Sequence, residues 1–372
     1  MLTQIAPFEC NIAYTEAVIR HSALLYRNRK SKDGKFMEEI EIIEEIAKKV
    51  LQENPNKVVR YLLLRDVVRE PIESQKLIEA ELALSDSLCI KELEKEQRDD
   101  GSWGAFHSRS VKGKEKIPST EVGVERALTL GLDSSHPILR RAGDYIINIL
   151  EGRIPFPDYH EKNDRWKTGM NLFLCSTLSL IHPEHPILDA TRKLWLQIAQ
   201  RTFSFGSYNE NDEIAAHKEL TGATVKDSYL VLNSRYHVIL LGSEERYLPK
   251  TLENLYIKWI WNLKEGIGYL EIPLFKIPPI DKPGLLDRWF VSHELLSRFY
   301  PRIWSNLVHN DIKWLWNNQN KELFWNFGSR ASTQHYFPLS DSWRYKNNKQ
   351  FDWTARVLIL LRRYYDAIED NN

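Results

Sequence analysis

Carboxylates near the starts of apolar segments are the side chains of this sequence best suited to chemistry. Glu121 and Glu125 are spaced to lie one turn apart on the same face of a predicted helix. Two carboxylates roughly 6.5–9.5 Å apart would serve inverting glycoside hydrolysis, one as acid and one as base. The alternative is that acidic residues simply stabilise first helical turns. The residues predicted to be catalytic are Asp352, Asp227, Glu121 and Asp287.

A second group of polar side chains would suit elimination chemistry. A lyase uses a tyrosine or histidine as base together with an arginine. Arg235, Tyr236 and His237 supply these types, but adjacent residues point to different sides of a helix. A structural role for each of them is the alternative.

Aromatic residues are abundant, with 12 Trp, 16 Tyr and 14 Phe, and they predict a packed core, an aromatic-lined cavity or a sugar-stacking cleft.

A long polar segment, 328–344, precedes the last predicted helix. Its two arginines could hold an anion such as a diphosphate in bidentate fashion. The predicted cavity and binding residues are Trp166, Trp289, Trp343, Trp353, Tyr229, Phe290, His335, Arg330 and Arg344.

No metal site or resident cofactor is predicted. Cys10, Cys89 and Cys175 are far apart, no pair has metal-ligand spacing, and Mg²⁺ would enter only with a diphosphate substrate. The 51 basic and 51 acidic residues give no global field to attract nucleic acid.

Since neither a signal peptide nor a long apolar run is visible, we expect a cytoplasmic chain without a membrane span. Peripheral membrane contact through an apolar patch remains an alternative.

Helices are predicted throughout, because apolar residues recur at helical spacing and no strand alternation occurs. The motif His-Pro-Ile-Leu recurs 49 residues apart, at His136 and His185, as in a two-helix repeat. These histidines are predicted to begin helices rather than bind a ligand. The predicted helices are 37–53, 58–68, 72–84, 87–96, 120–130, 135–150, 166–181, 183–202, 225–241, 244–263, 285–300, 303–316 and 351–368, with 209–213 among the polar spacers.

Gln97, Gly101 and Trp103 share a turn between two predicted helices, and Gln319 and Trp325 repeat the spacing near the other end. The amide can bond backbone groups at a helix end, and the indole can stack on a neighbouring turn. This pattern resembles the QW repeat of squalene-hopene cyclases and related prenyltransferase-like proteins. The resemblance implies an all-α fold, an (α/α) toroid or barrel of about five to six helical hairpins. We assign residues 1–84 to an N-terminal helical extension and 85–372 to the toroid, with QW-like turns at 97–104 and 319–328.

The segment Gln350–Ala355 resembles the DxDDTA acid motif of class II terpene cyclases. Asp352 falls on the position of the acid that protonates an alkene or epoxide, whereas Gln350 and Trp353 replace aspartates. The resemblance implies a terpenoid cyclase- or prenyltransferase-like protein that acts on or binds an isoprenoid, a hydrophobic small molecule, in an aromatic-lined cavity. The alternatives are a carbohydrate-active (α/α) barrel enzyme, either glycosidase or polysaccharide lyase, and a non-catalytic helical-repeat binding protein.

Overall fold

The computed structural model describes residues 33–108, 116–159, 162–224, 230–327, 337–345 and 347–370. Across these ranges every regular element is a helix, and the β-contacts are two isolated bridges, Ser234–Gly268 and Gly266–Ile272. The prediction of an all-α protein is therefore confirmed. The chain divides into two compact units, Met1–Ile42 and Ile43–Asn372. Residues 33–42 of the first unit form the beginning of helix α2 (Asp33–Gln52).

The second unit holds the rest of α2 and the other helices of the described ranges. Its first elements are α3 (Lys57–Leu62), the π-helix η1 (Leu63–Val68), α4 (Gln75–Leu82), the 3-10 helix η2 (Ala83–Asp86) and α5 (Leu88–Glu96). There follow α6 (Thr120–Thr129), α7 (Pro137–Leu150), α8 (Trp166–Ile181), η3 (Pro186–Leu188), α9 (Asp189–Thr202), α10 (Glu210–Thr221), α11 (Arg235–Gly242) and α12 (Lys250–Asn262). The last are α13 (Pro283–Phe299), α14 (Pro301–Leu307), α15 (His309–Asn317) and α16 (Asn348–Glu369).

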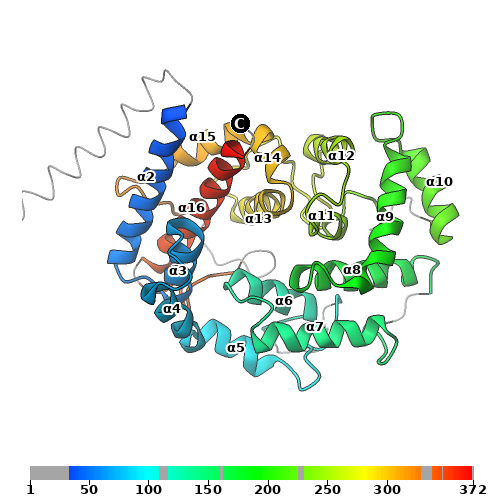
Figure 1. Cartoon of the computed structure of the whole chain (residues 1–372), viewed down its shortest axis with the longest axis horizontal. Coiled ribbons are helices and arrows are strands. Elements are labelled where there is room, and N and C mark those ends of the chain that lie inside the picture. The colour runs from blue at the N-terminus through cyan, green and yellow to red at the C-terminus, as the bar shows by residue number, and fades with distance from the viewer. Residues whose placement is uncertain are drawn as a thin grey trace, which may run out of the picture. The chain divides into compact units, whose positions relative to one another are not determined.

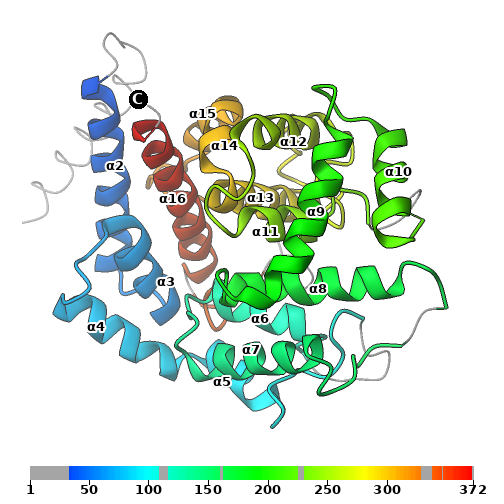
Figure 2. The ribbon, with the colours of Figure 1, turned by 45° about the vertical axis from the view of Figure 1, so that its right-hand side comes forward.

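Helices of the second unit that are not adjacent in sequence pack side by side (Figure 1). Helix α8 packs on α11, α11 on α13, α13 on α16, and α16 on both α3 and η1. The intervening helices cover this series: α7 contacts α6 and α8, α9 contacts α8 and α11, and α14 contacts α13 and α16 (Figure 2). One helix of each successive pair thus belongs to the series, and the other packs on the outside of it. Repeated helical hairpins are expected to pack in this way.

The two His-Pro-Ile-Leu sequences begin helical segments, as predicted. The Nδ1 atom of His136 accepts a hydrogen bond from the backbone N–H of Ile138 at 3.3 Å, and His185 accepts from Ile187 at 3.2 Å. In each case proline occupies the first turn, where a missing N–H costs nothing. Both histidines therefore cap a helix end.

Three predicted boundaries are wrong. The helix predicted over 225–241 is helical from Arg235, because Glu213 accepts the backbone N–H of Leu232 at 2.8 Å and holds residues 230–234 in a turn, while 225–229 lie outside the described residues. Helix α12 begins at Lys250 rather than Glu244, directly after Pro249. The predicted spacer at 209–213 instead starts α10, since Asn209 caps it by accepting from the N–H of Asp212.

None of the described helices combines the length and the apolar composition that crossing a bilayer requires.

Candidate active site

The turn that contains Gln97 and Trp103 fixes the start of α6. The Trp103 indole donates to the carbonyl of Leu93 at 3.0 Å, and its backbone N–H donates to Thr120 Oγ1 at 3.1 Å. The Gln97 amide donates to two carbonyls, those of Gly101 and Ile138, at 2.9 Å each. A side chain on Gly123 would approach the Trp103 ring to 2.4 Å, so the indole packs directly on the α6 backbone. These contacts hold the entry to α6 in one position.

The segment after this turn carries His107 to the first turn of α6. Backbone N–H groups of Thr120 and Glu121 donate to the carbonyls of Ala105 and Phe106 at 2.8 and 3.2 Å. From the other side, the Asp158 carboxylate accepts the N–H of His107 at 2.9 Å and of Ser108 at 2.7 Å. A backbone held on both sides has little freedom, so the His107 ring is positioned in advance of any ligand.

His107, Glu121 and Tyr236 form one hydrogen-bonded cluster. The Nδ1 atom of His107 lies 3.1 Å from both carboxylate oxygens of Glu121. The Tyr236 hydroxyl, from the start of α11, lies 3.0 Å from the same Nδ1 and donates to Glu121 at 3.0–3.2 Å. The His107 side chain is 26% exposed and that of Glu121 11% exposed, whereas Tyr236 is buried. The cluster thus joins three proton-exchanging groups from separate segments with one member open to solvent.

Burial and charge set the protonation states of this cluster. Burial opposes the charged form of His107, but the hydrogen bond and negative charge of Glu121 outweigh it and raise the His107 pKa. Burial, reinforced by the charge of Glu121, raises the pKa of Tyr236 well above 10. Tyr236 therefore stays neutral and serves as a donor. His107 is the member of the cluster that changes charge near neutral pH.

An ion pair joins the same two helices one turn further along α6. Arg235 Nη2 contacts the Glu125 carboxylate, and both groups are largely enclosed by protein. Burial raises the pKa of Glu125 against the opposing charge of Arg235. Arg235 and Tyr236 thus bind different carboxylates, Glu125 and Glu121. His237 faces elsewhere, with its ring 4.1 Å from Trp195, whereas Arg235 and Tyr236 both reach α6.

Aromatic rings surround the cluster. His107 stacks on Phe173 with ring centroids 4.2 Å apart, and Tyr269 meets both His107 and Tyr236 edge-on at 5.7 and 5.1 Å. Phe106, next to His107, contacts Phe156, whose ring meets Trp166 at 5.5 Å. Phe156, Trp166 and Tyr269 are all partly exposed. Of the predicted aromatic residues, Trp166 is therefore connected to the cluster through Phe156 and through Phe106, the residue before His107.

Asp352 has a different environment at the start of α16. Its carboxylate accepts the backbone N–H groups of Leu339 and Ser340 at 2.8 and 3.0 Å, together with the Ser340 hydroxyl and the Trp343 indole. It is 1% exposed. Burial raises its pKa, while these donors and the charge of Arg356 oppose the rise. Four donors on one carboxylate hold the segment 339–343 against α16.

The remaining predicted residues are dispersed. Trp289, Phe290 and Trp353 pack on one another at centroid distances of 5.0–5.1 Å and are at most 1% exposed, so they form core. Asp287 is buried on α13, and Arg344 is exposed. Asp227, Tyr229, Arg330 and His335 lie outside the described residues.

His107 is the residue that sequence reasoning missed. It lies in a non-helical segment, and its partners Glu121 and Tyr236 come from α6 and α11. The one available signal was its place four residues beyond Trp103, in a turn already expected to have a fixed conformation.

Comparison with protein-family models, with curated proteins and with solved structures finds no match to this chain. Within the described ranges, no group of three histidine, cysteine, aspartate or glutamate side chains is placed to hold a metal ion.

Proposed function

We propose that this protein is an enzyme that cleaves glycosidic bonds by general acid–base catalysis, with His107 as the central residue. The observation that carries the proposal is the contact of His107 Nδ1 with both Glu121 oxygens and with the Tyr236 hydroxyl, all within 3.1 Å. A carboxylate that holds the Nδ1 proton leaves Nε2 as the basic nitrogen. Among the described residues none is hydrogen-bonded to Nε2, and the side chain is partly exposed.

Each member of the cluster has a distinct role in this proposal. His107 Nε2 takes a proton from the substrate or from an attacking water. Glu121 orients the ring and stabilises the imidazolium that forms. Tyr236, kept neutral by burial, fixes the Glu121 carboxylate through its hydroxyl proton and is a positioning residue.

A carbohydrate fits the surroundings better than an apolar substrate does. Sugar rings present C–H faces that stack on aromatic side chains, and Phe156, Trp166 and Tyr269 offer partly exposed rings near the cluster. Tyr159, directly after Asp158, is 80% exposed. This corresponds to the carbohydrate-active function that the sequence left as an alternative.

The alternation of helices supports an (α/α) toroid as the arrangement of the second unit. Residues of α6, α8, α11, α13 and α16 line a common pocket, whereas none of the pocket residues comes from α7, α9, α12 or α14. An inner wall of alternate helices is the defining feature of such toroids, and the fold accommodates many chemistries.

The isoprenoid function has less support from the geometry. Its predicted acid, Asp352, is surrounded by four donors, and Trp289, Phe290 and Trp353 pack into core instead of lining the pocket. It stays a prediction, and squalene and prenyl diphosphates belong in the same assay.

A glycan panel tests the proposal. The wild-type chain should release reducing ends from at least one neutral or acidic polysaccharide, and an unsaturated product would identify elimination instead of hydrolysis. His107→Gln should lower the rate about 10²–10⁴-fold, the range for loss of a general base. The matched control is His309→Gln. His309 pairs with a tyrosine, Tyr364, at 2.9 Å but with no carboxylate, and its removal should leave turnover unchanged.

Two outcomes would overturn the proposal. The first is full turnover by a folded His107→Gln variant. The second is a panel without activity on any glycan, which would favour the isoprenoid or the non-catalytic alternative according to which ligand binds.

A further inference from the structure

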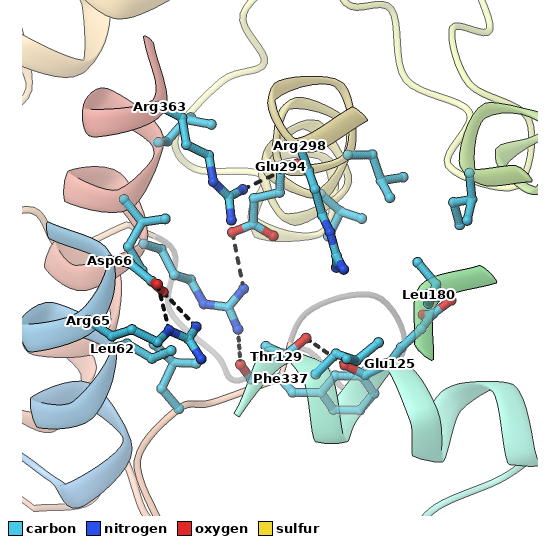
Figure 3. Close-up of a pocket in the computed structure, with 18 of the residues that line it drawn as sticks. Leu62, Arg65, Asp66, Glu125, Thr129, Leu180, Glu294, Arg298, Phe337 and Arg363 are labelled. Carbon is cyan, nitrogen blue, oxygen red and sulfur yellow. Dashed lines mark hydrogen bonds and ion pairs between the residues drawn. The ribbon is translucent and has the colours of Figure 1, made fainter. Parts of the chain in front are cut away.

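A separate pocket in the second unit is rich in arginine. It has a cavity volume of about 190 Å³ and is lined by residues of α3, η1, α6, α8, α11, α13 and α16 and of the segment before α16 (Figure 3). The pocket therefore suits a small ligand.

The charges around this pocket do not balance. Its lining residues include five arginines, Arg65, Arg235, Arg298, Arg356 and Arg363, and three carboxylates, Asp66, Glu125 and Glu294. Each carboxylate already has an arginine partner. Arg65 binds Asp66 at 2.6 and 2.8 Å, Arg235 contacts Glu125, and Arg356 lies 3.4 Å from Glu294. Among the described residues of the lining, two positive charges are left in excess.

The excess belongs to Arg298 and Arg363. Arg363 makes two long hydrogen bonds from Nη1, to the Glu294 carbonyl at 3.5 Å and to Ser297 Oγ at 3.4 Å. Neither acceptor is charged. For Arg298, no carboxylate of the described chain lies within ion-pair distance, and Figure 3 shows its side chain extending from α13 into the pocket without a dashed interaction. The contact that the structure gives its guanidinium is with the adjacent Phe299 ring, at 5.1 Å.

The electrostatics of Arg298 agree with this geometry. Arg298 is exposed as a residue, yet the protein around its guanidinium and the neighbouring charges of Arg363 and Arg65 lower its pKa to about 10. Burial likewise lowers the pKa of Arg363, which is half-buried. Apolar side chains such as Leu128, Ile239 and Leu295 share the lining. A ligand of opposite charge at this place would relieve the repulsion between the two guanidinium groups.

We propose that this pocket binds a small phosphate-bearing anion, with Arg298 and Arg363 as its principal ligands. A tetrahedral phosphate offers oxygens that planar guanidinium groups bind in bidentate fashion. A phosphate or diphosphate also matches the two excess charges and the small volume. The site is independent of the His107 cluster, because none of His107, Glu121 and Tyr236 lines the pocket.

Calorimetric titration and thermal unfolding with inorganic diphosphate, inorganic phosphate and a sugar phosphate test this site at fixed ionic strength. We expect saturable binding of at least one of them and a thermal midpoint that rises with its concentration. The tightest of the three identifies the natural form of the anion. Arg298→Met and Arg363→Met should each weaken that binding about tenfold or more, since each removes a charge-assisted contact.

Stability measurements separate loss of the site from loss of the fold. Without ligand, Arg298→Met should unfold close to the wild-type temperature, because Arg298 is exposed and pairs with no carboxylate of the described residues. Arg298→Lys retains the charge without the planar fork and should bind with intermediate affinity. Arg246→Gln is the control, because Arg246 is 85% exposed and pairs with Glu245 outside the pocket.

The proposal is overturned if none of the three anions binds more tightly than sulfate. It is equally overturned if a folded double variant of Arg298 and Arg363 binds as the wild type does. Since binding is measured without turnover, failure here is distinguishable from failure of the proposed glycosidase function.

Discussion

Two helix entries of this molecule share one hydrogen-bond pattern and yet hold two very different carboxylates. Trp103 and Trp325 each donate from the indole to the carbonyl ten residues earlier, at 3.0 and 2.7 Å. Each also donates from its backbone N–H to a threonine in the first turns of the next helix, Thr120 and Thr354, at 3.1 Å. The turns before α6 and α16 are therefore equivalent.

The carboxylates near these two turns differ in the groups that contact them. Glu121 follows Thr120 and contacts Tyr236 and His107, an imidazole that can exchange protons, at a place with access to solvent. Asp352 precedes Thr354 by two residues and contacts backbone amides, a serine hydroxyl and an indole, none of which titrates near neutral pH. The first environment is suited to proton transfer. The second is suited to holding a loop.

The largest expected effect is on stability, at Asp352. Asp352→Asn replaces one acceptor oxygen by an amide NH₂, so the four buried donors lose the charged acceptor that they share. We expect the free energy of unfolding to fall by about 2–4 kcal/mol. Chemical denaturation measures it, with Asp370→Asn as the exposed control, for which the change should stay within about 0.5 kcal/mol.

This variant also tests the acid role predicted from the cyclase resemblance. A folded Asp352→Asn chain with unchanged stability would contradict the structural role of the carboxylate. The same variant with full turnover on an isoprenoid would show that Asp352 is not the acid.

A matched pair of substitutions tests whether the two turns are equivalent. Trp103→Phe and Trp325→Phe each remove one buried indole hydrogen bond and part of a buried ring, and we expect each to cost about 2 kcal/mol. Thermal or denaturant unfolding of the two variants should give losses that agree within about 1 kcal/mol. A large loss of stability at one turn and none at the other would show that the two turns are not equivalent. Glu121 and Asp352 would then not occupy corresponding positions.

The local parts of this architecture could be predicted from the sequence, and the contacts between distant segments could not. Helical spacing and proline located most helices, and the repeated His-Pro-Ile-Leu located two helix entries. Glu121 can be predicted from the sequence as a candidate catalytic residue, because it lies at the start of an apolar helix, and this is a local property. The position of His107 depends on Asp158, 51 residues later in the chain, and on Tyr236, 129 residues away. No local spacing encodes these contacts.

Residue type alone also does not distinguish a side chain in the core from one that lines a cavity. Trp289 and Phe290 have the size and chemistry of a cavity lining, yet their neighbours on α15 and α16 enclose them completely. The pocket that holds Arg298 and Arg363 is lined largely by arginine and aliphatic side chains. Which side of a helix faces such a space depends on how its neighbours pack, and periodicity alone does not determine it.

The smallest expected effect is a pH dependence of stability that belongs to His107. Because its folded-state pKa is raised above the usual value near 6.5, protonated His107 stabilises the fold below that value. This stability is lost as pH rises through the raised folded-state pKa. Glu121→Gln removes the cause of the shift and leaves burial, which lowers the pKa. The variant should therefore lose more stability at pH 5.5–6 than at pH 8–9, by about 1 kcal/mol.

Urea unfolding across this pH range, with an NMR titration of the His107 ring, measures the effect. Tyr236→Phe is the control that sharpens the comparison, because it removes a hydrogen bond to Glu121 but leaves the carboxylate that raises the His107 pKa. Its loss of stability should be the same at both ends of the range. Parallel pH curves for the wild type and Glu121→Gln would mean that Glu121 does not control the protonation of His107. The two carboxylates would then differ in position and not in chemistry.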